Sequence, residues 1–564
     1  MSKHFNTTDS ESKKKTICVP AFSFALVFST AYVVGYSFNK DLSFSWCTQN
    51  SVLAAALFLI LMILAYHLCK MLFKASAPFS KSDGSKQIAR QLNARRSLLL
   101  FALLILLWSP FLLAFFPGSV TNDAMHQLYM YLSQNHWNNH HPALSTAVFG
   151  MLFQLGSLAG SDNYGVFTIV IIQAALQAIA IVCILREIDS LKAPRFVLLV
   201  ALAFFSLNPL FGSFAQLITK DTLFTSFFAL WVIAIAKFFV APTNSGKDRI
   251  LIVTKICVLS LLVSFFRHNG FYVVVLTIAP ILIWSSVRKL DTRPVWGTSL
   301  FFTSIIYISV SLFLFPILDI TPGSRAEAMS IPFQQTAAYV QKHVEDISEQ
   351  DEKAIARVLD YNALADAYNP QISDPVKSSF NKEATLGDLA MYFSAWTRMF
   401  IKHPLTYINA TIANSYGYVY PDIVNYRKDA IYRFYISDYS PDSAERTISV
   451  QYNHRLAEMR SGIAEATRTI VDTPLLFATS CCGVYTLILV WAICMLCYRR
   501  EYSCLMMLLP QFIIVLTCLA SPVNADMRYL FPVVLLTPFT IWWSIAGKTD
   551  STSTRTSKQG KEAR

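Results

Sequence analysis

Long apolar blocks separated by short polar links dominate the chain. Each block is long enough to cross roughly 30 Å of hydrocarbon as a helix, so each predicts a membrane span. The predicted spans are residues 17–38, 51–73, 97–116, 164–185, 196–211, 221–240, 250–266, 271–287, 297–317, 475–497, 502–520 and 529–547. This pattern predicts an all-α polytopic membrane protein with about 12 transmembrane helices.

One further apolar segment, residues 143–158, is short and carries Ser145, Thr146, Gln154 and Ser157. Counting it as a span would move every later basic link to the outer side, against the tendency of Lys and Arg to remain in the cytoplasm. We therefore expect this segment to lie at the membrane surface or to dip into it.

Basic residues give the predicted orientation. With Lys13–Lys15 in the cytoplasm, the same side receives the basic links 74–96, 186–195, 237–249 and 288–293, the Arg499–Arg500 pair and the tail after residue 547. The chain is thus predicted to be a multi-pass protein of the cell membrane with both termini cytoplasmic. The polar segments 117–142, 267–269, 319–474 and 521–528 and the link around Lys220 then meet at the outer face.

These spans and links divide the chain into five parts. Residues 1–96 hold the N-terminal tail, two spans and a basic link, and residues 97–317 form a membrane core with an outer loop at 117–163. Residues 318–474 are a mainly helical extracytoplasmic insert, with helical spacing over 326–367 and near 386–402 and 443–470. Residues 475–547 carry the last spans, and 548–564 are a basic cytoplasmic tail.

Composition excludes several other classes of protein. The chain is 54% hydrophobic and 15% charged, with a mean hydropathy of +0.43, which is typical of polytopic membrane proteins. The net charge is +12, but the Lys and Arg residues that produce it lie in the links between spans and in the two tails. They do not form a continuous basic surface, so we predict no nucleic-acid partner. None of the 11 cysteines lies in the insert, so no disulfide framework is expected there. No glycine-rich nucleotide motif supports ATP-driven transport.

Asp123 is the single acidic residue of a polar stretch, residues 116–142, that contains four histidines and no Lys or Arg. One interpretation is a first-turn acid stabilised by the helix dipole by ~0.3–1 kcal/mol. The other is a general base that takes a proton from an acceptor hydroxyl or amine. We favour the base, because the acid lies among imidazoles. For His140 and His141 we expect at least one substrate contact, and we favour this over a zinc site with His136, because zinc needs three or four converging ligands.

Three predicted outer segments place a basic residue at a helix start. These are Lys220 with Asp221; Arg267 with His268 and Asn269; and Arg528 with Tyr529. Each alone is explained by snorkelling or by a loop carboxylate. However, Lys and Arg usually remain on the cytoplasmic side, so basic residues on the outer side need an anionic partner. Together, Lys220, Arg267 and Arg528 therefore predict a phosphate-binding site. Asp221, His268, Asn269 and Tyr529 are then expected to contact substrate, with the imidazoles of His140 and His141.

Short motifs in these segments resemble those of the GT-C glycosyltransferases. The likeness is nearest to an uncharacterised bacterial group with the pattern PG-x4-D, HHP, KD-x-LF, R-x-NG and P-x-QQ, and it covers roughly residues 97–546. The matching residues are Pro117, Gly118 and Asp123; His140 to Pro142; Lys220, Asp221, Leu223 and Phe224; Arg267, Asn269 and Gly270; and Pro332, Gln334 and Gln335.

The resemblance implies sugar transfer, inverting or retaining, from a polyprenyl-phosphate-linked donor to a glycan, lipid or protein acceptor at the outer face, with Asp123 as base. Some GT-C enzymes pair two acids in this loop around a divalent metal, whereas here Asn122 precedes Asp123. The sequence therefore favours chemistry without a metal cofactor; a metal site completed by Asp221 or Asp526 is the alternative.

Two other functions compete with this one. A transporter or flippase of a lipid-linked or sugar substrate would place charges at mid-membrane depth in paired halves. An adhesion role for the insert would account for its tyrosines but not for Asp123.

Overall fold

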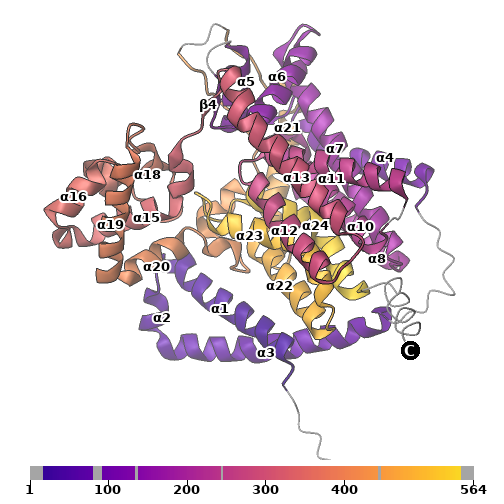
Figure 1. The fold of residues 1–564 in the computed structure, drawn as a ribbon, viewed down its shortest axis with the longest axis horizontal. Helices are drawn as coiled ribbons and strands as arrows, with labels where there is room; N and C mark the ends of the chain where they lie inside the picture. Colours follow the sequence, from indigo (N-terminus) through magenta and orange to yellow (C-terminus); the bar gives the residue numbers. More distant parts are fainter. Residues whose placement is uncertain (1–16, 81–91, 134–136, 243–244, 443–445, 548–564) are drawn as a thin grey trace, which may run out of the picture.

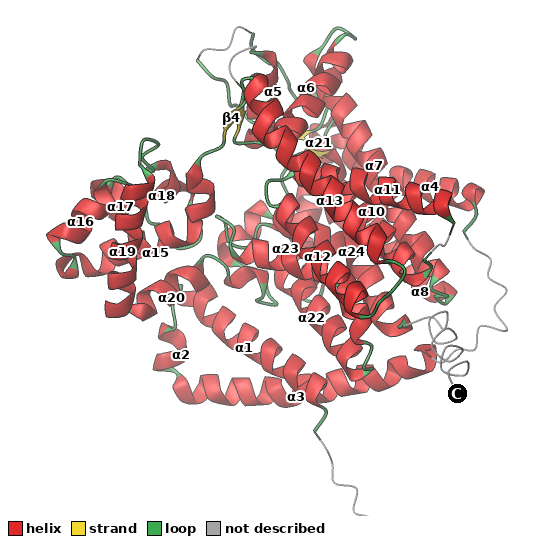
Figure 2. Ribbon diagram, in the orientation of Figure 1, coloured by secondary structure: helices red, strands yellow, loops and turns green. Residues whose placement is uncertain are grey.

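The computed structural model describes residues 17–80, 92–133, 137–242, 245–442 and 446–547, and these are overwhelmingly helical (Figures 1 and 2). The expectations for Lys13–Lys15, His136, most of the first basic link and the C-terminal tail lie outside the described residues.

Helices occupy all twelve predicted spans. The membrane part contains α1 (Val19–Asp41), α3 (Ser51–Ser80), α4 (Ala94–Ala114), α7 (Asp162–Ser190), α8 (Arg195–Leu207), α9 (Pro209–Gln216), α10 (Lys220–Val240), α11 (Gly246–Phe266), α12 (Gly270–Val287), α13 (Arg293–Ser309), α14 (Phe315–Ile317), α22 (Cys482–Tyr498), α23 (Leu509–Leu519) and α24 (Met527–Ala546). The short α2 (Ser45–Gln49) joins α1 to α3.

Nine of the helices in the described residues are long and apolar enough to cross a membrane. The predicted span 196–211 is a broken one: α8 and α9 meet at 49°, where Pro209 follows the end of α8 and the Asn208 side chain caps α9. Counting this pair as one span gives ten, and α22 and α23 are shorter apolar helices. The chain is thus an all-α polytopic membrane protein.

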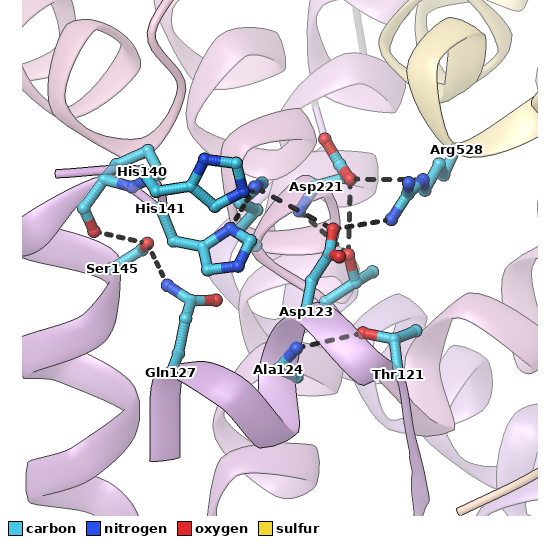
Figure 3. Close-up of polar contacts among 12 residues, drawn as sticks. Thr121, Asp123, Ala124, Gln127, His140, His141, Ser145, Asp221 and Arg528 are labelled. Carbon is cyan, nitrogen blue, oxygen red and sulfur yellow. Dashed lines mark hydrogen bonds and ion pairs between the residues drawn. The ribbon is translucent and has the colours of Figure 1, made fainter. Parts of the chain in front are cut away.

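Helix α6 (Ala143–Ser157) is the segment expected at the membrane surface. Its 15 residues extend only about 22 Å, less than the hydrocarbon thickness. It begins directly after Pro142 and packs on α5 (Asn122–Leu132), where Gln127 Nε2 donates to Ser145 Oγ at 2.6 Å (Figure 3). The loop before α6 is thereby held against α5.

The spans α7, α10 and α24 are the most buried and form the centre of the membrane part. Large aromatic side chains such as Trp231 and Trp543 fill this centre. Helices α1 and α3 lie along one side, packed on α22 (Figure 1). Apolar side chains of α3 and α13 remain exposed, as expected for helices that face lipid.

The region predicted as one insert divides into two structural parts. Its first part has its own buried core, which includes Phe333, Tyr392 and Tyr407, and projects to one side of the membrane helices (Figure 1). This part contains α15 (Ser330–His343), α16 (Glu349–Ala356), α17 (Leu364–Ala367), α18 (Asp374–Ser378), α19 (Leu386–Lys402) and α20 (Pro404–Ala413). The second part, residues 416–472, packs on the membrane core instead, through Tyr418 and Val471 among others. It ends in α21 (Ala457–Asp472), which begins later than the helix expected near 443–470.

Gln334 and Gln335 of the P-x-QQ motif belong to the core of this first part. Gln334 Nε2 donates to the Asn369 carbonyl at 2.6 Å, and Gln335 bonds to Thr411 and Trp396. These amides hold helices of the insert together.

Four two-residue strands fasten distant loops of the described chain. Strand β1 (Ser119–Val120) pairs in parallel with β3 (Leu217–Ile218), and β2 (Asn138–Asn139) pairs in parallel with β4 (Thr321–Pro322). The second pair joins the polar loop before α6 to the start of the insert, and the first pair builds the site described next.

Candidate functional site

Asp123 and Asp221 occupy the same position in the first turns of two neighbouring helices, α5 and α10. Strand β1 leads into α5 and β3 leads into α10, and the N-caps Thr121 and Thr219 each accept a backbone N–H bond with the side chain. Since the parallel pairing fixes the register, Asp123 and Asp221 follow their caps at equivalent positions. Asp123 lies in the first turn of its helix and Asp221 lies at the helix start predicted from the sequence.

A third helix start completes the arrangement. The side chain of Asp526 caps α24 by accepting the N–H of Arg528 at 3.3 Å. The N-termini of α5, α10 and α24 therefore meet at one place. Each contributes the positive end of a helix dipole, which favours a bound anion.

Arg528 contacts all three carboxylates of the cluster, and Figure 3 shows its contacts with Asp123 and Asp221. Its Nη1 donates to Asp123 Oδ2 at 2.9 Å and its Nε donates to Asp526 Oδ2 at 3.2 Å. The same Nε lies 4.0 Å from Asp221 Oδ2. With its side chain only 12% exposed, Arg528 is the central cation of the site.

Lys220 joins the cluster to the histidine loop. Its ammonium lies 3.9 Å from Asp123 Oδ2 and 3.0 Å from His141 Nδ1. An ammonium can only donate, so His141 Nδ1 is the acceptor and the imidazole carries its proton on Nε2.

Arg267 and Tyr529 lie on the other side of the cluster. Arg267 Nη1 is 3.6 Å from Asp221 Oδ1, and its guanidinium stacks over the Tyr529 ring at 4.8 Å. The Tyr529 hydroxyl accepts a hydrogen bond from Arg528 Nη2 at 3.0 Å. The structure thus brings together Asp123, His141, Lys220, Asp221, Arg267, Arg528 and Tyr529, as the sequence predicted.

Two further arginines belong to the cluster, and the sequence reasoning missed them. Arg427 and Arg433 donate to Asp526 Oδ2 at 3.0 Å and 2.6 Å. Their segment is fastened beside β1: Val120 donates to the Tyr435 carbonyl and accepts from Ser437 N–H. The available signal was the presence of arginines inside a tyrosine-rich stretch on the predicted outer face.

The cluster carries more positive than negative charge. Its cations are Lys220, Arg267, Arg427, Arg433 and Arg528, and its anions are Asp123, Asp221 and Asp526. The excess of two positive charges, with three helix N-termini, suits a phosphate dianion.

Burial and neighbouring charges shift the pKa values of Asp123, Asp526 and His141, which lie outside the membrane spans. Burial by itself would raise the pKa of Asp123, but Arg528 and Lys220 hold that pKa far below its usual range. Asp526 has a lowered pKa for the same reason, because Arg433, Arg528 and Arg427 outweigh its burial. Burial and the Lys220 ammonium lower the pKa of His141 to about 2, so this imidazole is neutral at physiological pH.

The other residues predicted to contact substrate, His140, His268 and Asn269, lie at the edge of the charged cluster. The His140 side chain is 45% exposed, with Nδ1 3.8 Å from Glu327 Oε1 in the insert. His268 Nε2 donates to the His140 carbonyl at 3.0 Å. Asn269 precedes α12, and its buried Oδ1 has no hydrogen-bond partner among the described residues. Within the described chain, the side chains of His268 and Asn269 form no hydrogen bond or ion pair with the three carboxylates.

The carboxylates of the cluster face guanidinium and ammonium groups. In the described part of the chain, the one group of three converging His, Cys, Asp or Glu side chains is His343, Asp346 and His403, in the insert. Asp123, Asp221 and Asp526 do not form such a group of three in the described chain.

No curated protein and no solved structure matches the chain. One family does match, over residues 134–559, a range that includes every charged residue of the cluster except Asp123. The chain therefore belongs to this family, the family of unknown function DUF6020.

Proposed function

We propose that this protein is a GT-C-type membrane glycosyltransferase that moves a sugar from a polyprenyl-phosphate-linked donor to a glycan, lipid or protein acceptor at the outer face. The observation that carries the proposal is the buried cluster with two excess positive charges at three helix N-termini. Such a site neutralises a phosphate, which is the leaving group in this reaction.

The donor phosphate binds among Arg528, Lys220 and Arg267. Guanidinium groups match phosphate oxygens in a planar fork, whereas the lysine acts as a point charge. Because α10 and α24 both begin at the cluster, a phosphate bound there lies at the ends of two membrane spans, at the depth of a lipid headgroup. The charge bias of the links supports an outer position for this end.

Asp123 acts as the base only after the donor is bound. In its present ion pairs the carboxylate is a weak base, because Arg528 and Lys220 stabilise its charge. A phosphate that draws these cations toward itself raises the pKa of Asp123. The acceptor oxygen then attacks the anomeric carbon, its proton passes to Asp123, and the bond to the polyprenyl phosphate breaks.

The depth of the charges favours an enzyme over a transporter. Lys220 is the first residue of α10, and Arg528 is the second residue of α24. Transport sites lie near the middle of the bilayer, between discontinuous helices. These charges lie at helix ends, where a headgroup meets water.

Mass spectrometry of surface glycans and lipid-linked sugars tests the proposal in cells that express Asp123→Asn. We expect loss of one glycan and accumulation of its polyprenyl-phosphate sugar at normal protein level. Asp162→Asn is the matched control, since Asp162 is also a first-turn carboxylate paired with an arginine, Arg446, but lies at the start of α7. This control should leave the glycan unchanged.

Unchanged glycans in Asp123→Asn would refute the base assignment. If Arg528→Lys also left every glycan and lipid intermediate unchanged, the transferase itself would be refuted. Counterflow of a lipid-linked or free sugar in vesicles containing the purified protein would favour a transporter.

A further inference from the structure

Two histidines and an aspartate that are not part of the charged cluster meet at a corner of the insert. His343 is the last residue of α15, and Asp346 ends the 3-10 turn Val344–Asp346 that follows it. His403 lies between α19 and α20 and flanks both helices. The three side chains therefore join two segments of the insert that are separated by more than fifty residues.

The three side chains converge closely. The His343 and His403 rings stack with centroids 3.8 Å apart and planes at 5°. His403 Nε2 is 2.7 Å from Asp346 Oδ2. Counting one ligand atom from each residue, all three atoms lie within 4.8 Å of one another.

Neighbouring groups hold this corner in place without help from a ligand. Lys402 Nζ donates to the Asp346 carbonyl at 2.7 Å, and His343 Nε2 is 2.9 Å from Thr406 Oγ1. The buried Tyr339 ring packs against both imidazoles, at 5.2 Å from His343 and 5.5 Å from His403. Such outer contacts orient ligand side chains before an ion arrives.

We propose that His343, Asp346 and His403 bind a divalent transition-metal ion of the Zn²⁺ class. Two imidazoles and one carboxylate are a ligand set that zinc accepts, with a fourth position open to water. The donor set argues against Ca²⁺ and Mg²⁺, which prefer oxygen ligands.

Binding requires a small movement. Tetrahedral zinc at roughly 2.0–2.1 Å from each ligand places ligand atoms about 3.3 Å apart. One imidazole must turn out of the parallel stack so that both lone pairs point to the ion. The half-exposed Asp346 side chain and the partly exposed His403 leave space for this rotation. The bound ion would clip the end of α15 to the α19–α20 corner.

The test uses the full-length protein in detergent micelles, stripped with EDTA and then exposed to Zn²⁺ alone. We expect about one zinc per chain by elemental analysis and a rise of several degrees in melting temperature, since a ligand that binds the folded state stabilises it. Asp346→Asn, His343→Ala and His403→Ala should each lose the bound zinc and the rise.

His454→Ala is the matched control, because His454 is an exposed histidine outside the cluster, and it should bind zinc like the original protein. Asp346→Asn changes one atom of a half-exposed side chain. A metal-free melting temperature equal to that of the EDTA-stripped original protein confirms that this variant folds. The proposal is overturned if the unmodified protein binds no zinc, or if Asp346→Asn and both alanine variants keep one equivalent, which would assign the metal to other ligands such as the cysteines.

Discussion

Asp123 and Arg528 are 405 residues apart in the chain, yet Arg528 Nη1 donates to Asp123 Oδ2 at 2.9 Å (Figure 3). This bond links the first polar loop of the membrane core to the start of the last helix. Because Arg528 also bonds to Asp526, the pair lies at the centre of the charged cluster.

The Asp123–Arg528 pair should show strong coupling in a double-mutant cycle. Arg528→Gln alone leaves partly buried carboxylates with fewer partners, and we expect it to cost about 3 kcal/mol or more. Asp123→Asn removes one of these carboxylates, so the double variant should be more stable than the sum of the single effects predicts, by about 0.5–3 kcal/mol. Thermal unfolding in micelles measures the cycle, and additive effects would show that the pair is not coupled.

Arg433 should contribute to anion binding more than to folding. In Arg433→Ala, Asp526 keeps two guanidinium partners, Arg427 and Arg528, so we expect a normal melting temperature. The variant removes one of the five positive charges of the cluster, so we expect binding of farnesyl phosphate to weaken roughly tenfold. Arg357→Ala removes an exposed insert arginine and serves as the control. Equal affinity in the two variants would place Arg433 outside the anion site.

His141 should make stability fall with decreasing pH. Its pKa is about 2 in the folded protein and about 6.5 when unfolded, so the unfolded state binds the proton first as the pH falls below 6.5. The contribution of His141 to the free energy of unfolding is therefore fully present above pH 6.5. It falls by up to about 2 kcal/mol between pH 7 and pH 5, because the unfolded state takes up the proton. His141→Asn should flatten the dependence of melting temperature on pH. An unchanged slope would mean that His141 is protonated in the folded state.

Gly118 should not tolerate a side chain. Its φ is +135°, and a Cβ there would lie 2.5 Å from Val170 Cγ2 and 3.0 Å from the Gln216 carbonyl oxygen. Gly118→Ala should therefore destabilise the protein by about 1–3 kcal/mol and loosen β1, which precedes Asp123. At Gly246 an added Cβ meets nothing within 4 Å, so Gly246→Ala is the control. Similar melting temperatures for the two variants would contradict this account.

Local patterns predicted the individual elements well. A helix in hydrocarbon satisfies its own backbone hydrogen bonds, so an apolar run of sufficient length identifies a span without knowledge of its neighbours. The same holds for the starts of α5 and α10, because Thr121 and Thr219 cap their helices through bonds to the next few residues. The break between α8 and α9 was missed although Asn208 and Pro209 mark it locally.

The sequence by itself determined the apolar helices, the capped helix starts and the segments that carry the acids and bases. Only the tertiary structure decided that β1 pairs with β3, that Arg427 and Arg433 reach Asp526, and that the second part of the insert packs on the membrane core. It also decided that Gln334 and Gln335 hold the insert together. These contacts join residues far apart in the chain, and they depend on shape and charge complementarity between surfaces, which leaves no periodic signal in the sequence.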